Sequence, residues 1–351
     1  MVRDFKRENS SILNQTIEAA YKSCIPLFVT IETTLGCNYK CVHCYNFDRS
    51  KPMPASLKGE PLSKEEFLTT IDQVCKAGAL YISFTGGEAL LYPHLYDLIS
   101  RVQENKSMSR LKTNGHLLTP EVCKKLVASG CRALDISVYG ADEKTYTDFA
   151  GDVGSFASVL SGIRNAIAED MEVQLNLILH SGNCLDIGNM IKMAESLGVP
   201  YQFSDEITSR YDGTEDSQEL GITKEQYDLL LNGPYKELFW HDNSEEAFQC
   251  SCARNVVGIG LDGEVFPCIG APIKSGNLRD SSFEEIWNNS LEFKKIRNLS
   301  QSDFKECVKC EVRHYCNRSS GSAFVNTENY TGCDPMALKV AKIRKEHSDK
   351  F

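Results

Sequence analysis

Short apolar runs rich in β-branched and aromatic residues recur up to about residue 205, and each has the length of a β-strand. Between them lie segments of helical period, such as 63–78 and 119–130, which open on Ser or Thr and close on Gly. The expected strands occupy residues 25–32, 79–85, 109–113, 132–140, 172–179 and 199–204. Alternating strands and helices predict parallel βα units.

Parallel strands spaced about 30 residues apart are typical of two architectures, a doubly wound sheet or part of a (β/α) barrel. Both place a functional site at the carboxyl ends of the strands. The stretch "TLGCNYKCVHCYN" at 34–46 directly follows the first expected strand. Its three cysteines therefore belong to the predicted site.

The pattern changes after the sixth strand. Residues 209–221 are polar and rich in turn formers, and from about 248 the chain is loop-rich and holds seven of the 15 cysteines. A region with so few regular elements is expected to depend on bound metal for stability. The predicted division is an N-terminal extension at 1–24, a barrel at 25–207, a bridge at 208–247, a small metal-binding domain at 248–336 and a C-terminal helix at 337–351.

Composition and charge narrow the function. The chain has 351 residues, 42% apolar and 25% charged, which is ordinary for a folded protein, and its net charge of -10 argues against nucleic acid as a partner. No N-terminal apolar segment and no run of about 18 apolar residues is present, so we expect a cytoplasmic protein without membrane attachment. In reducing cytosol, abundant cysteines indicate metal ligation or catalysis rather than disulfides.

Cys37, Cys41 and Cys44 have a spacing that chance rarely produces. With 15 cysteines in 351 residues, partners at both +4 and +7 arise by coincidence with a probability of about 0.03. Three thiolates can hold a cubane iron–sulfur cluster by three of its four irons. The remaining iron would then be open to an outside ligand.

The stretch "CNYKCVHC" resembles the CxxxCxxC signature of the radical S-adenosylmethionine (AdoMet) superfamily, and the likeness covers roughly residues 25–205. The resemblance implies an α/β fold with a partial, TIM-like (β/α)6 barrel. It also implies that the open iron of a [4Fe–4S] cluster binds AdoMet, whose one-electron reduction gives methionine and a 5′-deoxyadenosyl radical. The protein would bind, orient and shield that radical.

The same resemblance suggests which residues contact AdoMet. "GGE" after the second strand resembles the motif that binds the methionine amino group, whereas a Gly-Gly pair in that place is otherwise only a turn. His43 stands where the family has an aromatic residue near the adenine, with a solvated loop histidine as the alternative. The implied contacts are His43, Gly86, Gly87, Glu88, Asn114 and Ser137, the last two being otherwise strand-end turn residues.

The C-terminal cysteines resemble the SPASM extension of the same superfamily, which houses two auxiliary iron–sulfur clusters. The matching residues are Cys250, Cys252, Cys268, Cys307, Cys310, Cys316 and Cys333. Ser320 stands where the extension has a further cysteine, so the second set is complete in Cys307, Cys310, Cys316 and Cys333, but the first has only three cysteines. Structural zinc is the competing metal for four such cysteines. Most of the other cysteines are expected to be buried as small hydrophobic residues.

The resemblance favours a maturase that abstracts a hydrogen atom from a ribosomal peptide, giving a cross-link or an epimer. Chemistry on a small molecule or tetrapyrrole is the first alternative. A sulfatase maturase is disfavoured because Ile269, not aspartate, follows Cys268, and a non-enzymatic electron carrier is the last alternative. Expected partners are a precursor peptide and a reductant such as flavodoxin or ferredoxin. Only about 24 residues precede the first strand, so we expect a peptide leader to be read elsewhere.

Overall fold

The computed structural model describes residues 12–57, 59–151, 154–240 and 250–350. All six predicted strands are confirmed: β1 Phe28–Thr34, β2 Tyr81–Gly86, β3 Met108–Thr113, β4 Cys131–Val138, β5 Glu172–Ile178 and β6 Tyr201–Ser204. The helices that connect or follow them are α2 Lys64–Lys76, α3 Leu95–Glu104, α4 Pro120–Ser129, α5 Glu143–Ala150, α6 Phe156–Ala168 and α7 Ile187–Leu197. Each strand pairs in parallel with the next one along the chain.

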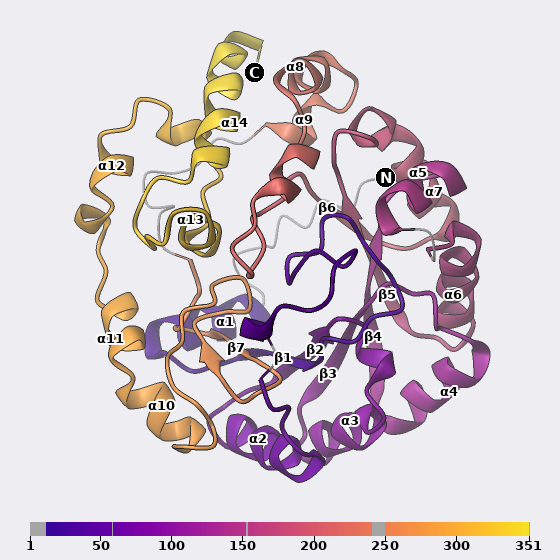
Figure 1. The fold of residues 1–351 in the computed structure, drawn as a ribbon, viewed down its shortest axis with the longest axis vertical. Helices are drawn as coiled ribbons and strands as arrows, with labels where there is room; N and C mark the ends of the chain where they lie inside the picture. Colours follow the sequence, from indigo (N-terminus) through magenta and orange to yellow (C-terminus); the bar gives the residue numbers. More distant parts are fainter. Residues whose placement is uncertain (1–11, 58, 152–153, 241–249, 351) are drawn as a thin grey trace.

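The strand order decides between the two architectures that the sequence leaves open. A doubly wound sheet reverses its strand order at a switch point. Here the order runs β6-β5-β4-β3-β2-β1 without reversal, and α2, α3, α4, α6 and α7 follow the outer side of the curved sheet (Figure 1). The fold is therefore the predicted partial (β/α)6 barrel.

Local sequence signals set the helix ends. Ser63 and Glu66 form a capping box at the start of α2. At α4, the Thr119 side chain caps the helix, Pro120 occupies its first turn, and Gly130 closes it with a left-handed φ of 104°. Alternate strand residues such as Ile31, Phe84 and Leu111 are fully buried in the core that these helices cover. The strands therefore present their other face to the inside of the barrel.

The C-terminal region does not stand apart from the barrel. Strand β7 Val256–Ile259 pairs in parallel with β1, and β8 Val265–Phe266 pairs antiparallel with β7, so the sheet has eight strands. Gly258 lies so close to the backbone after Cys268 that an added Cβ would be 2.6 Å from the Ile269 nitrogen. The sequence analysis did not predict this continuation of the sheet, because a four-residue strand is a weak signal without its neighbours.

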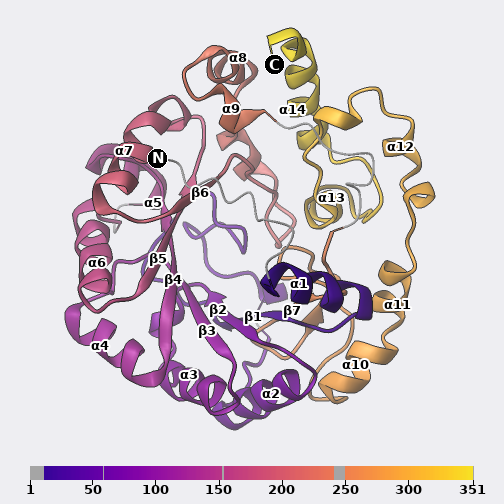
Figure 2. The same ribbon diagram turned by 180° about the vertical axis from the view of Figure 1, so that it is seen from behind.

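The remaining helices lie mostly on the side of the molecule away from α4 and α6 (Figure 2). They are α1 Ile12–Ser23, α8 Lys224–Asn232, α9 Lys236–Phe239, α10 Phe283–Asn289, α11 Leu291–Arg297, α12 Lys305–Val308, α13 Ser320–Thr327 and α14 Pro335–Glu346. Arg344 of α14 is buried, and its Nε donates to the Phe239 carbonyl (2.8 Å). Such contacts fix the C-terminal helix onto the segment that follows β6.

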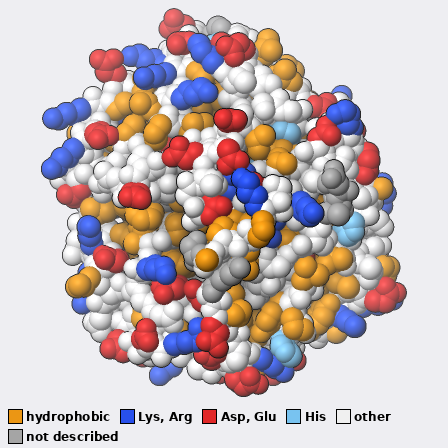
Figure 3. Space-filling view, viewed as in Figure 1, with side chains coloured by type: hydrophobic (Ala, Val, Ile, Leu, Met, Phe, Trp, Pro, Cys, Tyr) orange, Lys and Arg blue, Asp and Glu red, His pale blue; other side chains and the backbone are white. Residues whose placement is uncertain are grey.

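The predicted domain limits remain predictions, and parts of them, residues 1–11, 241–249 and 351, lie outside the described residues. Within the described part of the chain, no helix combines the length and the apolar character needed to cross a bilayer. On the face drawn in Figure 3, lysine and arginine side chains are scattered among acidic ones and form no broad basic area. This surface agrees with the net charge of -10.

Candidate active site and auxiliary cluster sites

The loop with Cys37, Cys41 and Cys44 follows β1 and is held by backbone contacts with the end of α5. The Lys40 N–H donates to the Ala150 carbonyl (3.2 Å), and the Val42 N–H donates to the Phe149 carbonyl (3.1 Å). The three thiols are close enough to influence one another's ionisation. The barrel thus gathers the predicted ligands at the carboxyl ends of its strands.

Arg49 is a partner of these thiols that sequence reasoning missed. Its Nε donates to the Cys44 sulfur (3.0 Å), and its Nη1 donates to the Leu35 carbonyl (2.9 Å). Burial raises the pKa of the Cys41 thiol to about 12, and the Arg49 charge acts in the opposite direction. Since metal binding requires thiolates, a fixed guanidinium beside the three sulfurs favours the ligating form.

The two glycines of the GGE motif allow two backbone segments to approach each other closely. An added Cβ would lie 2.2 Å from the Thr34 carbonyl oxygen at Gly86, and 2.1 Å from the Gly36 carbonyl oxygen at Gly87. The Gly87 N–H donates to Thr34 (2.6 Å) and the Glu88 N–H to Gly36 (2.8 Å). The glycines therefore fix the segment that leads into Cys37, a role that the sequence analysis did not consider.

Glu88 is fully buried and accepts hydrogen bonds from the protein itself. Its carboxylate accepts from the Thr113 hydroxyl (2.9 Å), the Asn114 N–H (2.9 Å) and the Leu90 N–H (3.1 Å). The Asn114 side chain donates to the Asn38 amide oxygen beside Cys37 (2.8 Å). A carboxylate has about four acceptor positions, so one remains for a further donor.

His43 is packed in an aromatic stack, so its interpretation as a solvated loop residue is wrong. Its ring stacks on Phe149 at 4.2 Å, and Phe149 stacks on His180 at 3.7 Å. Burial lowers the pKa of His43 to about 3, so the ring is neutral. Tyr139 packs against His43 at 5.0 Å and contacts both Cys41 and Ser137.

Three buried side-chain nitrogen atoms in this loop have no protein partner, Asn38 Nδ2, His43 Nδ1 and Asn46 Nδ2. Buried polar atoms are rarely left unpaired, and such exceptions occur where a ligand supplies the partner. Together with the three thiols and Arg49, they show that this site fits a cluster with a polar ligand on its open iron. The individual AdoMet contacts remain predictions.

Glu32 is a second residue that the sequence analysis missed. It lies on the inner face of β1, is 6% exposed, and accepts a hydrogen bond from the Tyr45 hydroxyl (3.1 Å). Burial raises the pKa of its carboxyl to about 7. An acidic residue within a strand gives no signal until the strand's inner face is known.

The segment after β6 also contacts the cysteine loop. The Tyr211 N–H donates to the Tyr45 carbonyl (2.8 Å), and the buried Arg210 donates to the Val42 carbonyl (2.9 Å). The Tyr211 hydroxyl donates to the Ile269 carbonyl next to Cys268. The polar stretch expected to act only as a bridge is therefore part of the wall between the loop and the auxiliary region.

The complete auxiliary set is assembled by two segments of the C-terminal region. Cys307, Cys310, Cys316 and Cys333 lie near enough for their charges to interact. The Cys310 N–H donates to the Cys307 carbonyl (3.1 Å), and the Cys333 N–H donates to the Glu306 carboxylate (3.2 Å). The structure thus brings together the four thiols that the sequence assigned to one set.

The incomplete auxiliary set is also brought together. The thiols of Cys250 and Cys268 both contact that of Cys252, and the Tyr330 hydroxyl lies 3.0 Å from the Cys250 sulfur. The Cys252 thiol is the main cause that lowers the pKa of Cys250. Ser320 lies at the same place, and its hydroxyl contacts the Cys250 thiol.

Within the described ranges, no three His, Cys, Asp or Glu side chains form a ready-made site for a single metal ion. A cubane cluster binds each thiolate to a different iron, so its ligands stand further apart than those of one ion.

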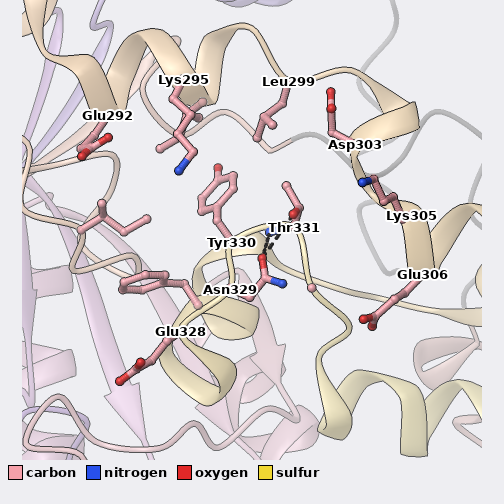
Figure 4. Close-up of a pocket in the computed structure, with 14 residues that line it drawn as sticks. Glu292, Lys295, Leu299, Asp303, Lys305, Glu306, Glu328, Asn329, Tyr330 and Thr331 are labelled. Atoms are coloured by element: carbon pink, nitrogen blue, oxygen red, sulfur yellow. Dashed lines mark hydrogen bonds between the residues drawn. The ribbon is translucent and has the colours of Figure 1, made fainter.

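A cleft of about 570 Å³ borders the auxiliary region rather than the cysteine loop (Figure 4). Its wall includes Tyr330, which contacts Cys250, and Glu306, which contacts Cys333. Lys295, Lys305 and Glu328 line the same cleft, so charges of both signs face it. The cleft therefore touches the surroundings of both auxiliary sets.

Comparison with known proteins agrees with this geometry. Residues 31–194 match the Radical SAM superfamily model, and residues 250–311 match the model of the SPASM iron–sulfur cluster-binding domain. The AdoMet-dependent heme synthase of Methanosarcina barkeri is 28% identical, with 89% of this chain and 96% of that protein covered. The PqqA peptide cyclase of Granulibacter bethesdensis is 23% identical, with 82% and 80% covered.

Solved structures share the fold. The structure of anSMEcpe with bound AdoMet has a TM-score of 0.69 at 16% identity and covers 93% of this chain and 94% of its own. Streptococcus suis SuiB, bound to the precursor peptide SuiA, has a TM-score of 0.64 at 15% identity, with 93% and 79% covered. At such identities the likeness establishes the architecture alone.

The chain therefore combines a radical SAM domain with a SPASM domain, and it is an enzyme of the radical SAM superfamily. Its cofactors are a [4Fe–4S] cluster, AdoMet and auxiliary iron–sulfur clusters in the SPASM domain. The non-enzymatic alternative is set aside, because the similar curated proteins are enzymes.

Proposed function

We propose that this enzyme cleaves AdoMet reductively and abstracts a hydrogen atom from a tetrapyrrole with carboxylate side chains, in a reaction that leads to haem. One observation carries the proposal, the likeness to the AdoMet-dependent heme synthase of M. barkeri across 96% of that protein. The likeness extends over both domains. It therefore reverses the preference of the sequence analysis, which placed a peptide first.

Cys37, Cys41 and Cys44 would hold the cluster by three irons, and AdoMet bound at the fourth supplies a 5′-deoxyadenosyl radical after one-electron reduction. The chain's own contribution is to place AdoMet and exclude water. Asn38 Nδ2 and His43 Nδ1 are two of the unpaired polar atoms of the loop that could contact AdoMet. The stack of His43, Phe149 and His180 supplies an apolar wall against a purine ring.

Glu88 would act chiefly as a positioning residue. Its carboxylate joins the ends of β2 and β3 through Thr113 and Asn114, and Asn114 in turn holds Asn38. One free acceptor position suits the AdoMet ammonium group. Gly86 and Gly87 would set the distance between this carboxylate and the cysteine loop.

Cationic residues on the inner face of the barrel support the proposal of an acidic substrate. Arg110 and Lys112 project from the same face of β3, and Arg110 forms an ion pair with Asp135 of β4 at 2.5 Å. The Arg110 side chain is 35% exposed, which leaves part of its guanidinium accessible. Arginine binds carboxylates through paired hydrogen bonds, so these cations suit the acidic side chains of a tetrapyrrole.

The test is an anaerobic assay with the reconstituted enzyme and a flavodoxin or ferredoxin as reductant. An iron tetrapyrrole precursor of haem should stimulate 5′-deoxyadenosine formation, and haem should appear by mass spectrometry. The Cys41→Ala variant should give neither product and serves as the control. AdoMet cleavage that the tetrapyrrole does not change, with no haem formed, would contradict the proposal.

A peptide substrate is the second candidate, supported by the likeness to a PqqA peptide cyclase over 82% of this chain. Short open reading frames beside the gene would supply peptides for the same assay. Loss of two hydrogens would indicate a cross-link, and uptake of one deuterium from heavy water at unchanged composition would indicate epimerisation. A modified peptide together with absent haem formation would favour this candidate.

A further inference from the structure

Ser320 lies beside the incomplete auxiliary set, at the Cys250 thiol. Its side chain is 1% exposed, and its hydroxyl contacts the Cys250 thiol. The thiols of Cys250 and Cys268 in turn contact Cys252, so three sulfurs and one oxygen lie together. A buried hydroxyl in this place is an additional potential metal ligand.

The start of α13 is built to hold Ser320 at these thiols. The Ser319 hydroxyl caps the helix by accepting from the Ser322 N–H (3.3 Å). At Gly321 an added Cβ would lie 2.5 Å from the Gly270 carbonyl oxygen. Only glycine therefore lets the first turn of the helix pack directly on the backbone that follows Cys268, and this contact fixes Ser320.

Arg318 holds the Ser320 oxygen from the other side. Its Nη1 donates to Ser320 Oγ (2.9 Å), its Nε donates to the Gly332 carbonyl (2.8 Å), and its Nη2 donates to the Tyr330 carbonyl (2.5 Å). The guanidinium also lies 5.0 Å from the centre of the Phe304 ring. All three guanidinium nitrogens of Arg318 thus donate hydrogen bonds, and one of these bonds goes to the Ser320 hydroxyl oxygen from a charged donor.

We propose that Ser320 Oγ is the fourth ligand of the first auxiliary cluster, completing the set of Cys250, Cys252 and Cys268. On cluster assembly the hydroxyl proton is released to solvent, as the thiol protons are. The oxygen then bears negative charge, which the Arg318 guanidinium stabilises through a charge-assisted hydrogen bond. The first cluster is therefore closed by oxygen and has no iron open to substrate.

The alternative gives Ser320 a smaller role. Its hydroxyl would only donate to the Cys250 sulfur, and the fourth iron would be open to an external ligand. The two arrangements differ in what happens when the oxygen is removed. A ligand's loss releases or exposes an iron, whereas the loss of a hydrogen bond to sulfur leaves the iron count unchanged.

The experiment uses the full chain with Cys37, Cys41 and Cys44 replaced by alanine, so that only auxiliary clusters remain. Iron and sulfide are counted after anaerobic reconstitution, and Mössbauer and EPR spectra are recorded. The triple-alanine chain that keeps serine at position 320, called the Ser320 chain, should hold about eight irons, corresponding to two [4Fe–4S] clusters. Ser320→Ala should lose about one iron per chain and show the EPR signal of a three-iron cluster.

Ser320→Cys should retain about eight irons but lose the Mössbauer component of the oxygen-bound iron. Ser322→Ala is the matched control on the same helix turn, because Ser322 is also buried but contacts Glu206 rather than a cysteine. The Ser322→Ala chain should have the same iron content and the same spectra as the Ser320 chain. If Ser320→Ala does not fold, the spectral difference between the Ser320 and Ser320→Cys chains decides the question.

Three results would overturn the proposal: an unchanged iron count and spectrum in Ser320→Ala, identical spectra for the Ser320 and Ser320→Cys chains, or only about four irons in the Ser320 chain. Binding of added imidazole to the auxiliary cluster of the Ser320 chain would also overturn it, because it would reveal an open iron. These measurements need neither AdoMet cleavage nor a substrate. Their outcome is therefore independent of the proposed haem chemistry.

Discussion

The cysteine loop and the first auxiliary set both offer three thiols, but they are assembled in opposite ways. Cys37, Cys41 and Cys44 lie in one loop, fixed by backbone bonds to α5 and by the glycines after β2. The auxiliary thiols come from two turns around β7 and β8, and α13 must pack on them to complete the site. Three ligands within one loop leave the fourth position for an external ligand. Ligands that come from segments far apart in the sequence allow another part of the fold to supply the fourth one.

Both sites place an arginine beside the sulfur ligands. Arg49 donates to Cys44, and Arg318 donates to Ser320. In each case the guanidinium also binds backbone carbonyls, which fixes its direction. With the proposed ligands in place, each guanidinium would offset the negative charge of ligating atoms in a buried site.

The largest expected effect is the complete loss of AdoMet cleavage while the auxiliary iron is retained. Cys41→Ala should abolish AdoMet cleavage, because the radical-generating cluster loses one of its three ligands. Iron bound at the auxiliary sets should remain. Quantifying 5′-deoxyadenosine and auxiliary iron in the same sample checks both statements, and unchanged turnover would refute the role of the loop.

Two glycine substitutions test whether each site depends on close backbone contact. Gly87→Ala should lower AdoMet cleavage about 100-fold, since displacement of the loop by about 1 Å is enough for such a loss. Gly321→Ala should leave cleavage without substrate intact but reduce auxiliary iron. The two variants would be compared by product formation and iron content.

Gly270→Ala is the matched control for both glycines, because its added Cβ would meet no atom closer than the Cys268 sulfur at 3.8 Å. It should resemble the unaltered chain in both measurements. If Gly321→Ala impaired AdoMet cleavage as strongly as Gly87→Ala, the two sites would not be separable as described.

The arginines should have intermediate effects. Arg49→Gln should weaken cluster retention in the loop about tenfold, a loss typical for residues that support metal ligands. Arg318→Gln should do the same for the auxiliary clusters and leave the cluster of the cysteine loop unchanged, because Arg318 donates to Ser320 and its charge also acts on Cys307. Iron release to a chelator over time measures both effects, and equal release from both sites in either variant would contradict the assignment.

The smallest expected effect is a change in how the unfolding midpoint depends on pH. Burial raises the pKa of Glu32 to about 7 in the folded chain from 4.5, so between these values the folded state holds a proton that the unfolded state lacks. This carboxyl therefore stabilises the fold most at low pH, and its contribution falls as pH rises through 7. Glu32→Gln should flatten the dependence of the unfolding midpoint on pH by a few degrees.

The exposed Glu60 provides the control for this change, because Glu60→Gln should leave the pH dependence as it was. Midpoints would be measured anaerobically by circular dichroism between about pH 5 and pH 8, the range that spans the raised value. An unaltered slope in Glu32→Gln would show that the Glu32 carboxyl is not the titrating group.

The sequence by itself determined the alternation of strands and helices and the position of the cysteine loop, because both are encoded over short distances. Strand and helix periods alternate, Thr119 and Gly130 bound a helix, and three cysteines follow one strand. The resemblance of the C-terminal cysteine spacings to the SPASM extension also implied both auxiliary sets. Pattern and spacing suffice when the interacting residues are neighbours along the chain.

Only the tertiary structure decided which distant residues complete these sites. Arg49, Tyr139 and Glu32 carry no motif, and their contacts with the cysteine loop arise from strand direction and packing. The sequence marked Ser320 as a missing cysteine, whereas the fold brings its hydroxyl to Cys250 and directs Arg318 at it. The physical reason is that helix packing over about 70 residues of chain separation, not local propensity, sets which oxygen meets which sulfur.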